Sequence, residues 1–175
     1  AAKTRLSEVP LKDLVASLAK RPPETVPGTA VFLTSDSESA PTALLHSLKH
    51  YKVLHDRNVI LTVKGATVPV VEEQRRLKIE QLSDRFWRIE ASFGFMENPN
   101  VPAMLLSIPK SEMSFSMMDT SFFLSRRSVR ASKYQGMPVW QDKLFIMMAK
   151  NANDASSYFR LPPGRVIEVG SQVTV

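Results

Sequence analysis

The feature that most constrains the fold of this chain is a pair of short apolar segments separated by a helical pattern. Residues 29–33 (TAVFL) and 58–63 (NVILTV) are rich in β-branched and aromatic residues, which is typical of strands buried on both faces. Between them a polar loop leads to Pro41, which suits the first turn of a helix running toward Val53. A strand–helix–strand unit of this length predicts two parallel strands joined by a right-handed crossover.

In residues 77–93 the apolar side chains recur at every second position and no longer at helical spacing. Residues 77–82 (LKIEQL) and 86–93 (FWRIEASF) place apolar and polar side chains in turn, and residues 83–85 (SDR) suit the turn between them. This alternation predicts an antiparallel hairpin with one face exposed to solvent. We expect the hairpin to lie at one edge of the sheet.

The other segments add both strands and helices. A proline-started helix is expected within residues 97–110, a strand over 120–124, an apolar helix over 139–149 and a final strand over 165–175. The sequence therefore predicts the α/β class: a single domain with a mixed, mainly parallel sheet, an antiparallel hairpin at one edge, and flanking helices.

The start of the chain has a different texture. Residues 9–18 (VPLKDLVASL) repeat apolar residues at helical spacing, and residues 20–27 (KRPPETVP) stop that helix and form a stiff joint. We expect residues 1–25 to be a lead-in helix and proline-rich joint, and residues 26–175 to be the domain proper. The absence of an initiator methionine suggests a piece of something longer.

Composition excludes several classes of function. The chain has no cysteine, so disulfides, thiolate-bound zinc, iron–sulfur clusters and cysteine nucleophiles are excluded, which fits a reducing compartment. The net charge is +6, but the cations are scattered and no basic run is interleaved with aromatic residues, so nucleic acid is not expected as a partner. The cytoplasmic face of a membrane explains the charge as well. No apolar run approaches the ~20 residues that cross a bilayer.

All three histidines fall in one stretch, residues 44–63, at His46, His50 and His55. His46 and His50 share one helical face, but Ser47 stands where a zinc-hydrolase helix needs glutamate. We expect these histidines to lie on the surface or at the end of a helix, and not to bind a metal. A position near a helix C-terminus would favour His50 and His55. No nucleophile elbow, phosphate loop or dinucleotide fingerprint is present, so no catalytic residue and no cofactor are predicted.

One loop has a physical reason to bind a ligand. Residues 34–39 follow the carboxyl end of the first strand and precede a helix, where free N–H groups and the helix dipole favour anions. Thr34, Ser35 and Ser37 could add hydroxyl contacts. The same residue types favour helix entries for capping alone, so the loop is open to both interpretations.

Four phrases resemble a known family. They are residues 21–63 (RPPETVPGTAVFLTSDSESAPTALLHSLKHYKVLHDRNVILTV), 93–105 (FGFMENPNVPAML), 117–127 (MMDTSFFLSRR) and 156–175 (SSYFRLPPGRVIEVGSQVTV). In this order they are similar to the C-terminal cytosolic domain of bacterial Kup-type potassium uptake proteins, the KUP/HAK/KT family. The resemblance runs from about Leu11 to Val175. Ser125 departs from it, because glycine is expected there.

The resemblance implies that the parent is a multi-spanning symporter of the inner membrane that moves potassium inward, generally regarded as proton-coupled. This chain would follow the last membrane helix on the cytoplasmic side, outside the ion pathway, and serve assembly or regulation. The expected partners are the transmembrane part of the same polypeptide and, as a further option, a second copy. The alternative is a regulatory module that senses a nucleotide or cyclic dinucleotide through the loop of Thr34, Ser35 and Ser37.

Overall fold

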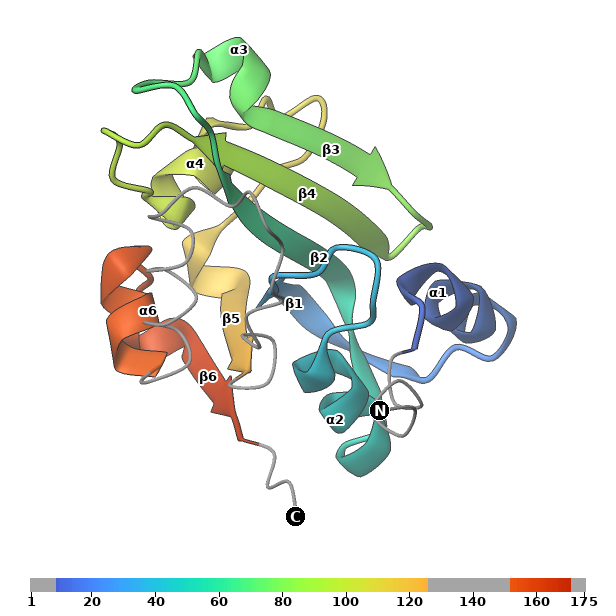
Figure 1. Ribbon diagram of the computed structural model, residues 1–175. Helices are drawn as coiled ribbons and strands as arrows, with labels where there is room; N and C mark the ends of the chain where they lie inside the picture. Colours follow the sequence, from blue (N-terminus) through green and yellow to red (C-terminus); the bar gives the residue numbers. More distant parts are fainter. Residues whose placement is uncertain (1–8, 126–151, 171–175) are drawn as a thin grey trace, which may run out of the picture.

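The computed structural model describes residues 9–125 and 152–170 as one sheet with helices on both faces (Figure 1). The strand order is β3-β4-β2-β1-β5-β6. All neighbouring strands are parallel except β3 and β4, which are antiparallel. The strands are β1 (Glu24–Leu33), β2 (Val53–Gly65), β3 (Leu77–Gln81), β4 (Phe86–Phe93), β5 (Thr120–Ser125) and β6 (Val166–Val169). The fold class predicted from the sequence is confirmed.

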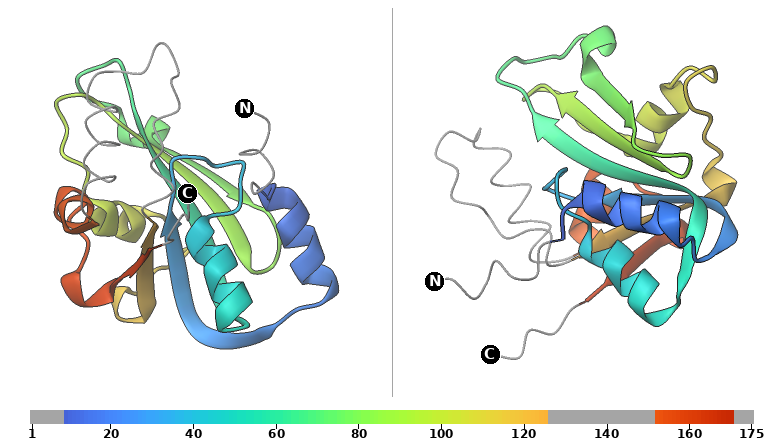
Figure 2. Two further views of the ribbon diagram at one scale, coloured as in Figure 1. Left: turned by 60° about the horizontal axis from the view of Figure 1, so that its bottom comes forward. Right: turned by 90° about the vertical axis from the view of Figure 1, so that its right-hand side faces the viewer.

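The helices divide between the two faces of the sheet (Figure 2). One core cluster contains residues of α1 (Leu11–Lys20) and α2 (Thr42–His50). The other contains residues of α4 (Val101–Ser107) and α6 (Ala152–Tyr158). The short helix α3 (Glu73–Arg76) precedes β3, and 3-10 turns at Met117–Asp119 and Pro163–Arg165 precede β5 and β6.

The predicted strand–helix–strand unit is β1, α2 and β2. The two strands pair in parallel from Thr29 opposite Arg57 to Leu33 opposite Leu61. The helix ends at His50, earlier than expected, because Lys52 adopts a positive φ of 56° that a helix cannot continue through. Since β2 begins at Val53, His55 lies within a strand, and its expected place near a helix end is wrong.

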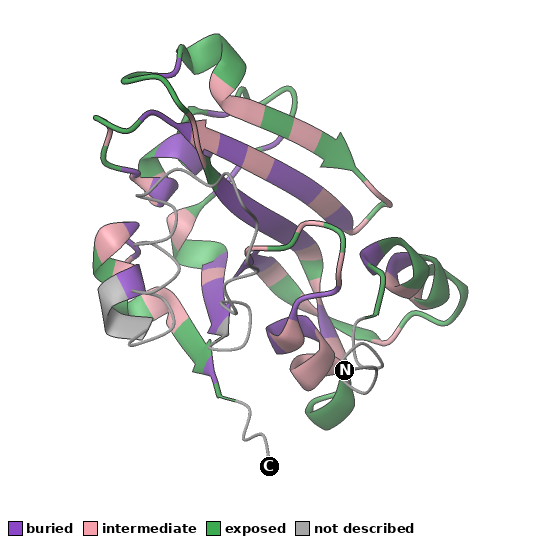
Figure 3. Cartoon of the chain, viewed as in Figure 1, coloured by how far each residue is buried: buried purple, intermediate pink, exposed green. Residues whose placement is uncertain are grey.

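The predicted hairpin is β3 and β4, and β3 lies at the sheet edge (Figure 1). The polar face of the hairpin is not uniformly exposed to solvent, since Arg88 of β4 is only 7% exposed. The Arg88 Nη1 atom donates a hydrogen bond to Glu80 across the hairpin, at 3.0 Å. Figure 3 shows the resulting contrast between the buried β4 and the more exposed β3.

The other predicted elements are partly within the described residues. The proline-started helix is α4, which Asn100 caps by accepting a hydrogen bond from the Ala103 N–H at 3.1 Å. The strand over 120–124 is β5, and the final strand is β6 up to Val169. The helix expected over 139–149 and residues 171–175 lie outside the described residues.

The lead-in helix is packed into the core. Leu11 is fully buried and Val15 is 5% exposed, both in the cluster that includes α2. The backbone of Leu11 donates to Glu38 at 2.8 Å, and Ala40 donates to Val9 at 2.7 Å. Strand β1 begins at Glu24, inside the segment expected to be a joint. The division of the chain at residue 25 stays a prediction.

Truncation of Leu11 tests how far α1 belongs to the fold. We expect Leu11→Ala to lower the free energy of unfolding by about 2–4 kcal/mol, because it leaves a cavity between α1 and the sheet. Urea unfolding followed by far-UV circular dichroism measures the loss. Lys12→Ala, on the exposed side of the same helix, is the matched control and should change stability by less than about 0.5 kcal/mol. Equal effects of the two substitutions would contradict the packing of α1.

Candidate functional site

Two loops at one end of the sheet are joined into a single structure. They follow β2 and β4, whose carboxyl ends lie side by side. Ala66 donates its N–H to Phe93 at 2.8 Å, Phe95 donates to Val68 at 3.0 Å, and Met96 donates to Pro69 at 3.0 Å. We call residues 66–71 and 94–97 the loop ridge.

Gly94 permits this close pairing. A Cβ atom at this position would lie 2.2 Å from the carbonyl oxygen of Pro69, far closer than any side chain allows. A residue without a side chain is therefore required where the two loops meet. Gly94 belongs to residues 93–105, one of the phrases that carries the family resemblance.

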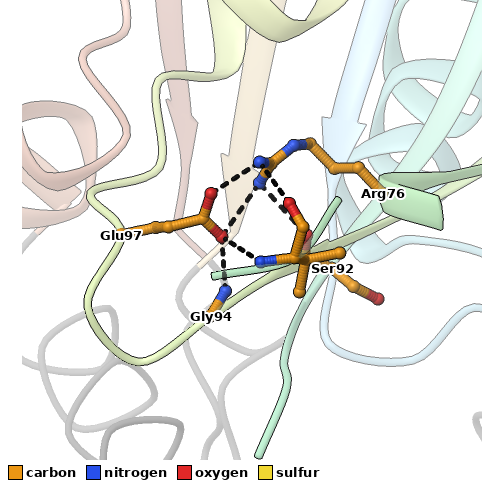
Figure 4. Close-up of polar contacts among 5 residues, drawn as sticks. Arg76, Ser92, Gly94 and Glu97 are labelled. Atoms are coloured by element: carbon orange, nitrogen blue, oxygen red, sulfur yellow. Dashed lines mark hydrogen bonds and ion pairs between the residues drawn. The ribbon is translucent and has the colours of Figure 1, made fainter. Parts of the chain in front are cut away.

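An arginine–glutamate pair fastens the loop ridge to α3 (Figure 4). Arg76 Nη2 lies 2.6 Å from Glu97 Oε1, and Nη1 lies 3.2 Å from Oε2. The arginine also donates to the carbonyls of Val71 and Ser92, at 3.1 and 3.3 Å. Glu97 Oε2 accepts from the N–H groups of Gly94 and Val71, at 2.6 and 3.1 Å. A bidentate pair with these added bonds fixes both loops and the strand end together.

Both side chains of this pair are largely buried, at 15% exposure for Arg76 and 16% for Glu97. The Arg76 guanidinium also lies over the Phe93 ring, 4.6 Å from its centroid. The pKa of Glu97 is lowered from its ordinary 4.5 to about 2, mainly by the hydrogen bonds from Arg76 and also by the N–H groups of Gly94 and Val71, against the opposing effect of burial. The carboxylate is therefore ionised throughout the physiological range.

The loop ridge displays apolar side chains to solvent. The exposed fractions are 45% for Val68, 63% for Val70, 53% for Phe95 and 73% for Met96. The backbone hydrogen bonds between the two loops and the Arg76–Glu97 pair fix the backbone that carries these side chains. Rigid exposed apolar residues that gather in one place are typical of an interaction surface.

The predicted ligand loop lies where the sequence placed it, between β1 and α2, but its polar groups have partners. The Thr34 hydroxyl bonds with the backbone of Asp36 at 3.2 Å, and Ser37 donates to the carboxylate of Glu90 at 3.2 Å. Glu38 donates its N–H to the Asp36 side chain at 2.9 Å. Ser35 lies between Thr34 and Asp36 in the same loop. The carboxylates around the loop make it a poor environment for an anion.

The histidines do not form a cluster with metal-binding geometry. The rings of His46 and His50 lie on one face of α2, 4.5 Å apart between centroids. His55 contacts Phe123 instead, at 5.9 Å, and burial lowers its pKa against the opposing effect of Asp56. Among residues 9–125 and 152–170, no group of three or more His, Cys, Asp or Glu side chains could hold a metal ion.

The family model described as "K+ potassium transporter C-terminal domain" matches residues 27–175. Three relatives are similar over 99% of this chain. "Probable potassium transport system protein Kup 3" of Bradyrhizobium sp. (strain BTAi1 / ATCC BAA-1182) is 58% identical, and "Probable potassium transport system protein Kup" of Nitrobacter hamburgensis is 57% identical. The protein of the latter name from Brucella abortus is 56% identical. No solved structure matches the chain.

These similarities define the family of the chain. The chain belongs to the family of K+ potassium transporter C-terminal domains, as its sequence phrases indicated. It spans only about 27% of the length of the first relative. The relatives are named as transport proteins, which points away from an enzyme. Within the described parts of the chain, no helix is long and apolar enough to cross a membrane.

Sequence reasoning missed the Arg76–Glu97 pair. The two residues are 21 positions apart, and neither stands in a recognised motif. The signal that could have pointed to Glu97 is the family phrase at residues 93–105, which also contains Gly94. Its conspicuous residues prove to be a close-approach glycine, an ion-pair carboxylate and the helix cap Asn100.

Removing the charge of Glu97 should weaken the loop ridge and change the acid response. Because the pKa of Glu97 is lower in the folded state, its stabilisation is present above pH 4.5 and is lost as the pH falls toward 2. We expect Glu97→Gln to lower the free energy of unfolding at pH 7 by about 2–3 kcal/mol, and to flatten its fall between these pH values. Urea unfolding at a series of pH values measures both effects.

The control for this experiment is Glu112→Gln, which neutralises an exposed carboxylate outside the loop ridge. It should leave the unfolding free energy at pH 7 within about 0.5 kcal/mol of the wild type. A Glu97→Gln variant with the same pH profile as the wild type would show that the Arg76–Glu97 pair does not stabilise the fold.

Proposed function

We propose that this chain is the cytosolic C-terminal domain of a membrane potassium-uptake protein, where it serves assembly or regulation by docking against the membrane part. Family membership supports the transport context, and the relatives are much longer than this chain. The observation that carries the docking role is the loop ridge, whose apolar side chains are exposed and held rigidly. The surface that covers them in the whole protein is, on this proposal, the transmembrane part of the same polypeptide.

The proposal places potassium in the membrane part and not in this domain. Proton coupling likewise belongs to the parent, as a symporter of the inner membrane. The net charge of +6 suits a position beside the anionic cytoplasmic leaflet. No enzymatic activity, cofactor or nucleic-acid partner is part of this function. A second copy of the chain is a further partner that the function allows.

Regulation requires two arrangements of the domain that differ in their contacts with the membrane part. The lead-in helix α1 is suited to connect the two parts, because it packs in the core and its N-terminus bonds to the loop after β1. A displacement of the chain ahead of α1 would therefore act first on α1 and on the loop after β1. The loop ridge would supply the contact that differs between the two arrangements.

Polar substitution on the loop ridge tests the docking role. We expect Phe95→Ser combined with Met96→Ser to lower the rate of potassium uptake by the full-length protein, or the size of its regulatory response, about fivefold. The reason is that two exposed apolar contacts of the interface are lost. Uptake in bacterial cells that lack other potassium uptake systems is the measurement. The fold should survive, since both side chains are more than half exposed.

Met118→Ser is the matched control. Met118 is 75% exposed, close to the 73% of Met96, but it lies before β5 and away from the loop ridge. Its uptake should equal that of the wild type. If the Phe95 and Met96 variant transports normally, responds normally and is as abundant as the control, the docking role of the loop ridge is wrong.

One observation favours the alternative function, the sensing of a nucleotide or cyclic dinucleotide. Arg88 is buried, and its Nε and Nη2 atoms have no hydrogen-bond partner in the described structure. Nη2 lies 3.9 Å from the carboxylate of Glu38, in the predicted ligand loop. A phosphate could occupy the free edge of the guanidinium if Glu38, 74% exposed, moved away. The carboxylates of Glu80 and Glu90 nearby oppose an anion.

We therefore expect no binding of such ligands by the 175-residue chain. Calorimetry and thermal unfolding with adenine nucleotides and cyclic dinucleotides at millimolar concentration should show no heat and no rise in Tm, since a ligand that binds the folded state raises Tm. A rise that disappears in Arg88→Met would establish the alternative. A rise that persists in that variant would place the ligand elsewhere on the domain.

A further inference from the structure

A long open groove runs between the edge hairpin and helix α4. Its volume is about 1060 Å³. The lining comes from the face of β3 and β4 that lies on the side of α4, and from α4 and the segment after it. The apolar lining comes from Leu77, Ile79, Trp87, Phe93, Met104 and Ile108. The groove is therefore a partly uncovered margin of the larger core cluster, to which Leu77, Ile79 and Trp87 belong as half-buried members.

The outer side of this groove is a free strand edge. Strand β3 is the last strand of the sheet, and among the described strands it pairs only with β4 (Figure 1). Its outward N–H and C=O groups can pair with another extended segment. Because Leu77 and Ile79 face the groove, every second side chain of an added strand would lie beside them at the groove mouth. Strand addition of this kind uses backbone bonds for affinity and side-chain sites for selectivity.

The polar rim of the groove is acidic although the chain as a whole is basic. Arg76 is matched by Glu97, which leaves Glu73 and Glu112 without a cation among the lining residues. The net charge of the lining is thus −2, from three glutamates and one arginine, against +6 for the whole chain. The other polar lining groups include side-chain amides, at Gln74, Gln81, Asn98 and Asn100. This rim favours a cationic partner over an anionic one.

We propose that the groove binds an extended peptide segment, added as a strand to the free edge of β3, whose groove-facing side chains are apolar at the centre and lysine or arginine at the two ends. The apolar side chains contact Leu77 and Ile79, and the cations reach Glu73 and Glu112. A second copy of this chain is a poorer occupant, because a two-fold axis at β3 brings the two acidic rims together. The inference stands apart from the proposed docking role, which uses the loop ridge.

The test uses the full 175-residue chain and a synthetic peptide with both ends blocked, Thr-Lys-Thr-Val-Thr-Val-Thr-Lys, in which the lysines and valines share one face of an extended strand. We expect the amide NMR signals of β3 and the groove to shift on titration, and the affinity to fall as salt is added. The same peptide with glutamate in place of lysine should bind about tenfold more weakly. Glu73→Gln combined with Glu112→Gln should weaken binding of the lysine peptide about fivefold and leave the fold unchanged.

A matched pair of edge substitutions locates the site. Ile79→Lys, on β3, should weaken binding about tenfold, because it removes an apolar contact and repels the peptide. Ile167→Lys, on the opposite edge strand β6, should leave binding unchanged, and Ile167 is 45% exposed. Circular dichroism and urea midpoints check that both variants fold.

Three results would overturn the proposal. One is no shift of β3 signals at millimolar peptide, and another is equal binding of the lysine and glutamate peptides. The third is a concentration-dependent shift of β3 signals without peptide, together with a dimer mass in light scattering, which would assign the groove to a second copy.

Discussion

The structure depends on the burial of the central strand pair. Residues Ala30 to Leu33 of β1 and Val59 to Leu61 of β2 are at most 3% exposed. Strands with apolar side chains on both faces need cover on both sides, and parallel strands need crossover connections. The placement of α1 and α2 on one face, and of α4 and α6 on the other, meets both requirements. The stacking of Phe32 on Phe123, 4.9 Å apart between centroids, extends the same core to β5.

Elements with short-range signals could be predicted from the sequence, and those that depend on distant partners could not. The central unit and the hairpin follow from period and punctuation within about ten residues. The early start of β1, the place of His55 and the burial of Arg88 depend on contacts with other elements, which local patterns do not encode. The family phrase at residues 93–105 does contain Gly94 and Glu97, but only the structure shows that the two residues serve one purpose. The ligand interpretation of Thr34, Ser35 and Ser37 stays a prediction.

The Arg76–Glu97 pair connects the two proposed surfaces. It holds the loop ridge through the backbone of Val71 and Gly94, and both of its side chains also line the groove beside β3. The loop ridge and the groove therefore share this ion pair, and a partner that binds at either surface contacts a structure that the pair holds in place. An ion pair with so many backbone bonds resists gradual distortion, because each bond is directional.

The path of α1 has a mechanical consequence. The chain meets the fold at a bridge between Pro10 and Ser39, runs along α1 for 10 residues, about 15 Å, and turns back into β1. Tension on the chain ahead of Val9 is thus borne first by the backbone bonds to residues 38–40, and reaches β1 only after α1 has been stripped from the sheet. The contacts of α1 and of residues 38–40 therefore resist a pull on the chain before it reaches the central strand β1.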